Sequence, residues 1–311
     1  MQNIFKIFQN LRNESPRDGD SFAIASLPTI KNHKLGVSLN GQPMFFIKCD
    51  EKTKAKSLDT NLEFISVQFN RQCQLINTKG KIVEGIYTII SLKSDSDYLQ
   101  EYFLKIVFVL LKNLSEKPLL KELKIEIEKL INLFTKFSKP ALKTIQGLWA
   151  ELLIIEQSKN PDYLIKSWHN STSDKYDFND GNDKIEVKST TKSRRIHNFS
   201  LEQLIPNTKS KLIISSILTI ETGTGTSVFD LVELIESKLK DQNLIYRINE
   251  IVASTLGKDF EKVFDIYFDY KFSVDSIQHY DSVDIPTINI SSIPSNILNV
   301  RFDCDLTDVK T

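Results

Sequence analysis

The feature that most constrains this chain is the segment YDFNDGNDKIEVKST near its middle. Its Asp-Gly pair, flanked by β-prone residues, is typical of a tight hairpin. Pairing Asn179 with Lys184 across a four-residue loop places Asp177 opposite Glu186. Because side chains alternate along a strand, Lys188 then shares a face with both carboxylates. The apolar residues of the hairpin face the other way, toward a core.

This hairpin brings two negative charges together. Directly opposed Cβ atoms in a sheet lie about 5 Å apart, so the two carboxylates repel each other unless a cation lies between them. Mg²⁺ prefers oxygen ligands of this kind and often binds one or two carboxylates plus a substrate phosphate. A lysine beside the metal would orient a water molecule or stabilise charge on the phosphate. A surface hairpin with a cross-strand ion pair is the alternative.

The Glu-x-Lys spacing alone is weak evidence, because it occurs three times in the chain. Residues 122–124 and 236–238 lie in helical patterns, where positions i and i+2 do not share a face. Only the copy that ends at Lys188 lies in a strand pattern with an aspartate opposite. The strand context therefore distinguishes this copy from the other two.

Three segments around the hairpin resemble the PD-(D/E)XK nuclease superfamily. They are GLWAEL at 147–152, the hairpin itself with its EVKST strand, and HNFS at 197–200 with the following Gln203. The chain more closely resembles one family of such proteins, often encoded beside restriction and phage-defence genes. One departure is Tyr176, which stands where the motif often has a proline.

The resemblance implies an α/β (α+β) fold with a restriction-endonuclease-like αβββαβ core and a β-rich N-terminal domain. It also implies Mg²⁺-dependent hydrolysis of DNA phosphodiesters, with Mn²⁺ able to substitute. Asp177 and Glu186 would be metal ligands, joined by the carbonyl of Val187. Lys188 would position the attacking water and stabilise the phosphate. Glu151 matches an acidic residue on the first helix that helps to hold metal through water.

The predicted helix around Glu151 supports a role for this carboxylate. Leu148, Leu152 and Ile155 form an apolar stripe, and Glu151 lies within it. A carboxylate on a buried face needs a partner, because burying an unpaired charge is costly. The partner is either the metal site or a neighbouring lysine at the edge of the stripe.

Basic residues gather around and beyond the hairpin. Residues 184–211 hold seven basic and two acidic side chains, which favours a polyanion as partner. We expect Arg194, Arg195 and His197 to contact nucleic-acid phosphates. Gln203 is expected to lie near the site and to contribute to nucleic-acid binding. Solvated loop charges and a helix-surface glutamine are the alternatives.

The hydrophobic pattern divides the chain into three regions: a β-rich domain at 1–95, a helical connector at 96–138 and a nuclease domain with a β/α extension at 139–311. The nuclease region alternates helices and strands, which predicts a mixed sheet flanked by helices. Its predicted helices cover 141–157, 199–205, 227–240 and 243–254. Its predicted strands cover 164–169, 175–179, 184–190, 211–220, 263–272, 286–290 and 300–306.

Composition excludes several classes of protein. The chain has 40 basic and 40 acidic residues and is 41% hydrophobic, which is too apolar for a disordered chain. Cys49, Cys73 and Cys304 are too far apart for a zinc ribbon or a disulfide framework. No signal peptide or membrane span is evident, so we expect a cytoplasmic protein without membrane contact.

Two further functions remain open at this point. The chain could be a non-catalytic subunit that binds nucleic acid or a partner within a defence complex. It could also be a nuclease that acts on RNA through the same chemistry. We expect DNA as the main partner, with other defence-system subunits and a homodimer as further candidates.

Overall fold

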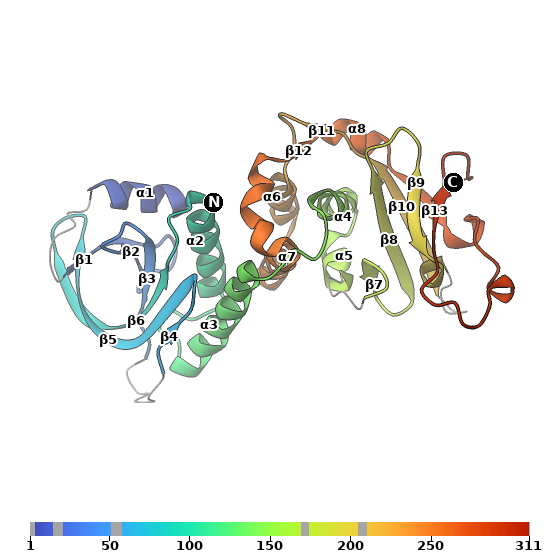
Figure 1. Ribbon diagram of the computed structural model, residues 1–311. Helices are drawn as coiled ribbons and strands as arrows, with labels where there is room; N and C mark the ends of the chain where they lie inside the picture. The colour runs from blue at the N-terminus through green and yellow to red at the C-terminus, as the bar shows by residue number, and fades with distance from the viewer. Residues whose placement is uncertain (1–3, 15–20, 51–57, 169–173, 205–209, 311) are drawn as a thin grey trace. The chain divides into compact units, whose positions relative to one another are not determined.

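The chain divides into two compact units. The computed structural model describes residues 4–14, 21–50, 58–168, 174–204 and 210–310 of the 311 residues (Figure 1). The N-terminal unit covers residues 1–139 and the C-terminal unit covers residues 140–311. The two helices predicted as a connector at 96–138 belong to the N-terminal unit.

The N-terminal unit is built on a sheet that closes on itself. Its strands follow the order β1-β2-β3-β6-β5, and β1 pairs in parallel with β5 to complete the ring. β4 extends the sheet from β5. The elements of this unit are α1 (Ile4–Glu14), β1 (Ser21–Ser26), β2 (Lys34–Val37), β3 (Pro43–Ile47), β4 (Thr60–Asn61), β5 (Ile65–Asn77), β6 (Ile82–Leu92), α2 (Asp97–Lys112), α3 (Leu120–Phe134) and the 3₁₀ helix η1 (Thr135–Ser138).

The C-terminal unit is mixed α/β. Its helices are α4 (Ile145–Gln157), α5 (Pro161–Ser167), α6 (Val228–Lys238), α7 (Gln242–Leu256) and α8 (Tyr270–Asp275), with 3₁₀ helices η2 (Leu201–Leu204), η3 (Gly257–Asp265), η4 (Ser282–Asp284) and η5 (Ile290–Ser292). Its strands are β7 (Phe178–Asn179), β8 (Asp183–Thr190), β9 (Ile196–Ser200), β10 (Lys211–Leu218), β11 (Glu221–Thr222), β12 (Tyr267–Phe268), β13 (Gln278–Asp281) and β14 (Arg301–Asp305).

The main sheet of this unit has the order β13-β10-β8-β7. β8 and β10 run parallel, and the other pairs are antiparallel. In the β7–β8 hairpin, Phe178 pairs with Ile185 and Asn179 pairs with Lys184, which confirms the predicted register. Helices α4 and α5 lie on one side of this sheet, and β9 lies on the other (Figure 1).

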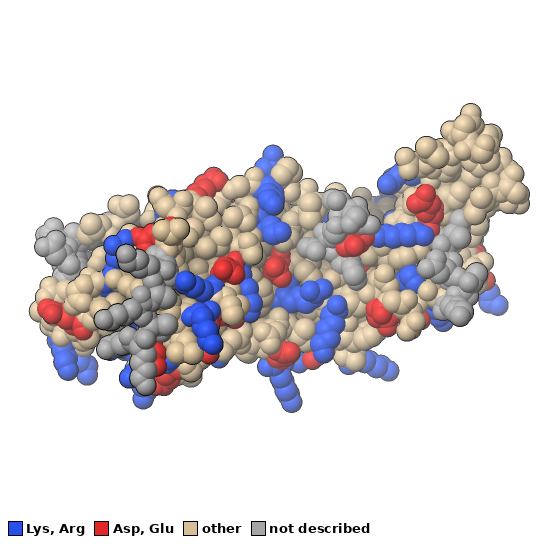
Figure 2. All heavy atoms as spheres, turned by 90° about the horizontal axis from the view of Figure 1, so that it is seen from below, with Lys and Arg blue, Asp and Glu red and all other residues tan. Residues whose placement is uncertain are grey.

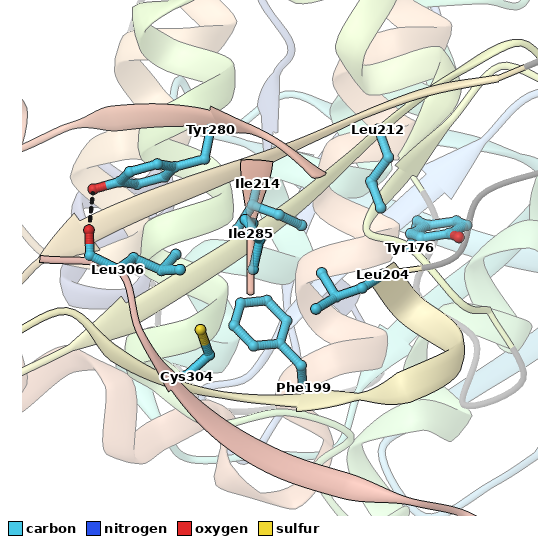
Figure 3. Close-up of a cluster of buried hydrophobic side chains, with 9 residues drawn as sticks. All are labelled: Tyr176, Phe199, Leu204, Leu212, Ile214, Tyr280, Ile285, Cys304 and Leu306. Carbon is cyan, nitrogen blue, oxygen red and sulfur yellow. Dashed lines mark hydrogen bonds between the residues drawn. The ribbon is translucent and has the colours of Figure 1, made fainter. Parts of the chain in front are cut away.

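A ribbon of two strands, β9 and β14, covers the face of the sheet opposite α4. An apolar cluster holds it there, and Figure 3 shows these side chains converging between the ribbon and β10. The hydroxyl of Tyr280 donates to the carbonyl of Leu306 at 3.0 Å, so the one polar group of that ring is satisfied. The cluster contains Tyr176, Phe199, Leu204, Leu212, Ile214, Tyr280, Ile285, Cys304 and Leu306.

Some expected elements are wrong. The strand predicted at 164–169 is helical up to Ser167, because Asn160 accepts from the backbone of Tyr163 as an N-cap and Pro161 starts the helix. The strand predicted at 263–272 is divided among η3, β12 and α8. No strand is found at 286–290, which is a described range. Residues 169 and 205, at the ends of two predicted elements, lie outside the described residues.

Helix α4 is anchored at its centre by Trp149. The indole N–H donates to the carbonyl of Thr226 at 2.9 Å, and the ring centre lies 4.9 Å from that of Phe268. Next to this contact, a Cβ atom at Gly225 would lie 2.5 Å from the carbonyl oxygen of Phe268. The close approach of these two backbone segments therefore requires glycine. No described helix is long and apolar enough to cross a membrane.

Replacing Gly225 by alanine is expected to destabilise the protein by about 1–3 kcal/mol, because the added methyl group must push the backbone of Phe268 away from Trp149. Gly223 provides a matched control, since a Cβ atom there meets nothing within 4 Å. Gly223→Ala should stay within about 0.5 kcal/mol of the wild type. Denaturant unfolding of both variants measures the difference, and equal stabilities would contradict the packing argument.

Candidate active site

Asp177 lies directly before β7, one residue outside the last backbone pair of the hairpin, which joins Phe178 to Ile185. Its Oδ2 accepts a hydrogen bond of 2.9 Å from the backbone N–H of Val187 on β8. The side chain of Asp177 thus satisfies the backbone N–H of Val187, which lies beyond the end of β7. The carboxylate is held at the edge of the sheet, where it can interact with groups from both faces.

Glu186 faces the β9 side of the sheet. Its Oε1 accepts from the Nζ of Lys188 at 2.8 Å and from the Nε2 of Gln203 at 2.9 Å. Gln203 belongs to η2, and its own Oε1 accepts from the backbone N–H of Ser200. The structure therefore brings Gln203, which the sequence placed near the site, into direct contact with a predicted metal ligand.

Lys188 lies two residues along β8 from Glu186, on the same face. Its ammonium lies 5.2 Å from the centre of the Phe199 ring, within cation–π distance. The ion pair and the ring together fix the end of a flexible side chain. The lysine is mostly buried, with 19% of its side chain exposed.

Glu151 projects from α4 and is buried, with 5% of its side chain exposed. Its Oε2 accepts from the indole N–H of Trp168 at 2.7 Å, and its Oε1 accepts from the ammonium of Lys143 at 2.6 Å. The same ammonium lies 2.5 Å from Oδ1 of Asp177. Glu151 thus has the lysine partner considered as an alternative, and this lysine also links it to Asp177.

The crowding of carboxylates changes their proton affinity. Burial first, and then the charge of Asp177, raise the pKa of Glu151 to about 8 and the pKa of Glu186 to about 7. Burial alone would lower the pKa of Lys143, but the charges of Glu151 and Asp177 raise it above its ordinary value. Lys143 therefore stays protonated at neutral pH, and the two glutamates retain their protons to a higher pH than a free glutamate does.

The donor set suits a hard divalent cation. Asp177, Glu186 and Glu151 supply carboxylate oxygens, which are the ligands that Mg²⁺ prefers. As the side chains lie, no three acidic, histidine or cysteine side chains of the described residues converge on one point. Lys143 stands between two of the carboxylates. The side chains therefore have the ligand atoms that a divalent metal needs. In the structure, Lys143 contacts two of those oxygens, one on Glu151 and one on Asp177.

The three basic residues after β8 have different surroundings. Arg194 is 62% exposed and pairs with Asp305 at 2.5 Å. The guanidinium of Arg195 lies inside the fold, where it donates to the carbonyl and hydroxyl oxygens of Ser216 at 2.9 Å. The Nε2 of His197 lies 2.7 Å from the same hydroxyl oxygen.

Burial first, and then the charges of Lys188 and Arg195, lower the pKa of His197 to about 4, so this ring is neutral at pH 7. Arg195 and His197 therefore form part of the interior beside Lys188. Their contact with nucleic-acid phosphates stays a prediction that this geometry does not favour. Arg194 is the one of the three that lies open to solvent.

A family model described as "Putative PD-(D/E)XK family member, (DUF4420)" matches residues 4–307. The chain belongs to this family. The DUF4420 match covers nearly the whole chain and includes both units, and it agrees with the superfamily indicated by the hairpin motif. No curated protein and no solved structure matches the chain.

Two residues of the site were not predicted from the sequence as site residues. Lys143 lies just before the N-cap of α4 and 34 residues from Asp177, so no local spacing connects the two. Trp168 is buried in the core, and its indole N–H donates to Glu151. The one nearby sequence signal is Thr144, whose hydroxyl accepts from the N–H of Gly147 and caps α4. It indicates where the helix begins but gives no role to Lys143.

In the absence of metal, the protein should lose stability as pH rises from about 6.5 to about 8.5. Folding raises the pKa of both Glu151 and Glu186 above the ordinary value of 4.5, so the folded state binds more protons than the unfolded state in this range. Rising pH removes these protons and favours unfolding. The buried histidines at 33 and 197, whose pKa values folding lowers from the ordinary 6.5 to about 4, act in the opposite direction, mainly at pH values between these two.

Melting temperatures across this pH range, measured in EDTA, test the prediction. Glu151→Gln removes one of the two titrating groups, so its melting temperature should fall less steeply than that of the wild type. Parallel curves for the two proteins would show that Glu151 does not bind its proton more tightly in the folded state.

Proposed function

We propose that this protein is a Mg²⁺-dependent endonuclease that hydrolyses DNA phosphodiester bonds, in the cytoplasm, as part of restriction or anti-phage defence. One observation carries the proposal: the buried carboxylates of Asp177 and Glu186 lie at the open end of the β7–β8 hairpin beside the fixed ammonium of Lys188, and Lys143 links Asp177 to the buried Glu151. Membership of the DUF4420 family supports the superfamily, and the site residues support the chemistry.

In this proposal, α4, β7, β8, β9, η2 and β10 form a restriction-endonuclease-like core in the order αβββαβ. β9 departs from a simple four-stranded arrangement, because it pairs with β14 and lies over the sheet. This departure brings Phe199 to Lys188 and so contributes to the site.

Asp177 and Glu186 would hold the metal, with the carbonyl of Val187, and Glu151 would assist through water. A bound Mg²⁺ supplies a water of lowered pKa and neutralises charge on the phosphate. Lys188 would orient the attacking water and donate to a phosphate oxygen as negative charge develops there. Its ammonium is already held in place by Glu186 and Phe199, so little ordering is needed at the moment of reaction.

The nucleic-acid partner is supported by charge. Residues 184–211, which include the strand that carries Lys188, have an excess of basic side chains. Elsewhere the charges are mixed: Figure 2 shows Lys and Arg interspersed with Asp and Glu over one face of the molecule. Recognition of DNA would therefore depend on the surroundings of the hairpin, with Arg194 as the exposed candidate for a phosphate contact. A homodimer and binding to other defence subunits remain part of the proposal.

Incubation of the purified protein with plasmid, linear duplex and single-stranded DNA, in Mg²⁺, Mn²⁺ or EDTA, tests the proposal. Cleavage should require metal, and Lys188→Ala should slow it by at least about 100-fold, because a donor to the developing charge is lost. Asp177→Ala should have a comparable effect through loss of a metal ligand. Lys258→Ala is the matched control, because Lys258 is exposed, belongs to the same unit and lies outside residues 184–211.

Cleavage that survives in both Lys188→Ala and Asp177→Ala would contradict the proposed site. Cleavage of RNA but not DNA would retain the site and change the substrate. Folded protein that cuts neither nucleic acid, alone or with defence-system subunits, would favour a non-catalytic binding subunit.

A further inference from the structure

One ammonium group lies between two carboxylates of the candidate site. The Nζ of Lys143 is 2.6 Å from Oε1 of Glu151 and 2.5 Å from Oδ1 of Asp177. Both acidic side chains are nearly buried, with 5% and 12% exposed, while 27% of the lysine side chain is exposed. The lysine side chain is therefore more exposed than the two acids, and its ammonium extends inward to contact both of them.

The other oxygen of each carboxylate is already occupied by the fold. Oε2 of Glu151 accepts from the indole of Trp168 at 2.7 Å, and Oδ2 of Asp177 accepts from the backbone N–H of Val187 at 2.9 Å. Oε1 of Glu151 and Oδ1 of Asp177 are therefore the more available oxygens for a cation that binds both acids. These are the two oxygens that Lys143 contacts.

The backbone that carries Lys143 is fixed on both sides. The N–H of Leu142 donates to the carbonyl of Thr255 at 2.8 Å, and the hydroxyl of Thr144 caps α4 by accepting from Gly147 at 3.1 Å. The ammonium can leave the carboxylates by rotation of its own side chain, without movement of helix α4. Four rotatable side-chain bonds give lysine the necessary freedom.

We propose that Lys143 is a built-in counter-ion that competes with a divalent cation for Asp177 and Glu151. The inference rests on the metal-binding part of the proposed function and goes beyond it by assigning Lys143 a role. In the metal-free protein, the ammonium offsets the repulsion between the two acids and keeps them in place. A metal binds by displacing it, so part of the affinity for metal is lost to this competition.

The competition sets a threshold for metal. At low metal concentration the site is closed by its own ion pairs, and the carboxylate geometry is preserved without a bound cation. At higher concentration the divalent charge displaces the single charge of the lysine. Lys143 is thus a positioning residue for Asp177 and Glu151, and it lowers the affinity of the site for metal.

Isothermal titration of Mg²⁺ into metal-free protein at pH 8, without nucleic acid, tests the inference. Lys143→Met keeps most of the side-chain length and removes the charge. It should bind Mg²⁺ roughly 5- to 150-fold more tightly than the wild type, which is the usual range for coupling between two ligands. Its melting temperature in EDTA should be lower than that of the wild type, and Mg²⁺ should raise it by more.

Two controls isolate the position and the charge. Lys139→Met removes an equal charge from an exposed lysine four residues earlier and should bind Mg²⁺ as the wild type does. Lys143→Arg retains the charge at the site and should also remain close to the wild type. Magnesium affinity of Lys143→Met that equals or falls below that of the wild type would overturn the inference.

A second measurement avoids the risk that Lys143→Met fails to fold. Crystal structures of the wild type, without metal and with bound Mg²⁺, should show the ammonium moved away from Asp177 and Glu151 only when metal is bound. An ammonium that stays on both carboxylates beside bound metal would overturn the inference. These readouts do not depend on cleavage, so a protein that cuts no nucleic acid would weaken the proposed function while the competition itself could still be measured.

Discussion

The repulsion among three buried carboxylates is the constraint on which the C-terminal unit depends. Asp177 acts electrostatically on both Glu151 and Glu186, and each of these acids is withdrawn from water. Burial of several like charges is unfavourable unless cations and hydrogen-bond donors face them. The surrounding helices and strands place the cations and hydrogen-bond donors that these carboxylates need.

The compensating groups come from separate parts of the chain. Lys143 and Trp168 reach Glu151 from the α4 and α5 side, whereas Lys188 and Gln203 reach Glu186 from the β9 side. Asp177 can interact with both sets because it lies at the edge of the sheet, beyond the end of β7. The shortness of β7 is therefore essential, since a longer strand would replace this carboxylate with backbone pairing at the same edge.

Sequence reasoning succeeded where the determining forces were local. The Asp-Gly turn and the alternation of apolar residues fixed the hairpin register, because a slip of one residue would expose its apolar face. The strand predicted at 164–169 was wrong because apolar residues outweighed the capping signal of Asn160 and Pro161. A lysine was one of the two partners considered for Glu151, but which lysine could not be predicted, because Lys143 meets Asp177 only after the sheet and α4 have packed together. The family resemblance supplied the roles of the site residues, and spacing alone would not have separated one Glu-x-Lys from the other two.

The pairing of β9 with β14 joins positions that are far apart in the sequence: Asn198 lies opposite Asp303, 105 residues later. The ring of Phe199, which lies against the ammonium of Lys188, belongs to this ribbon. Chains emerge from the ribosome in order, and domains generally fold as units. The residues of the hairpin are therefore synthesised long before the strand that secures the aromatic support of its lysine. A chain that stops before β14 has the acidic half of the site without a fixed lysine, and the complete arrangement requires residues 301–305.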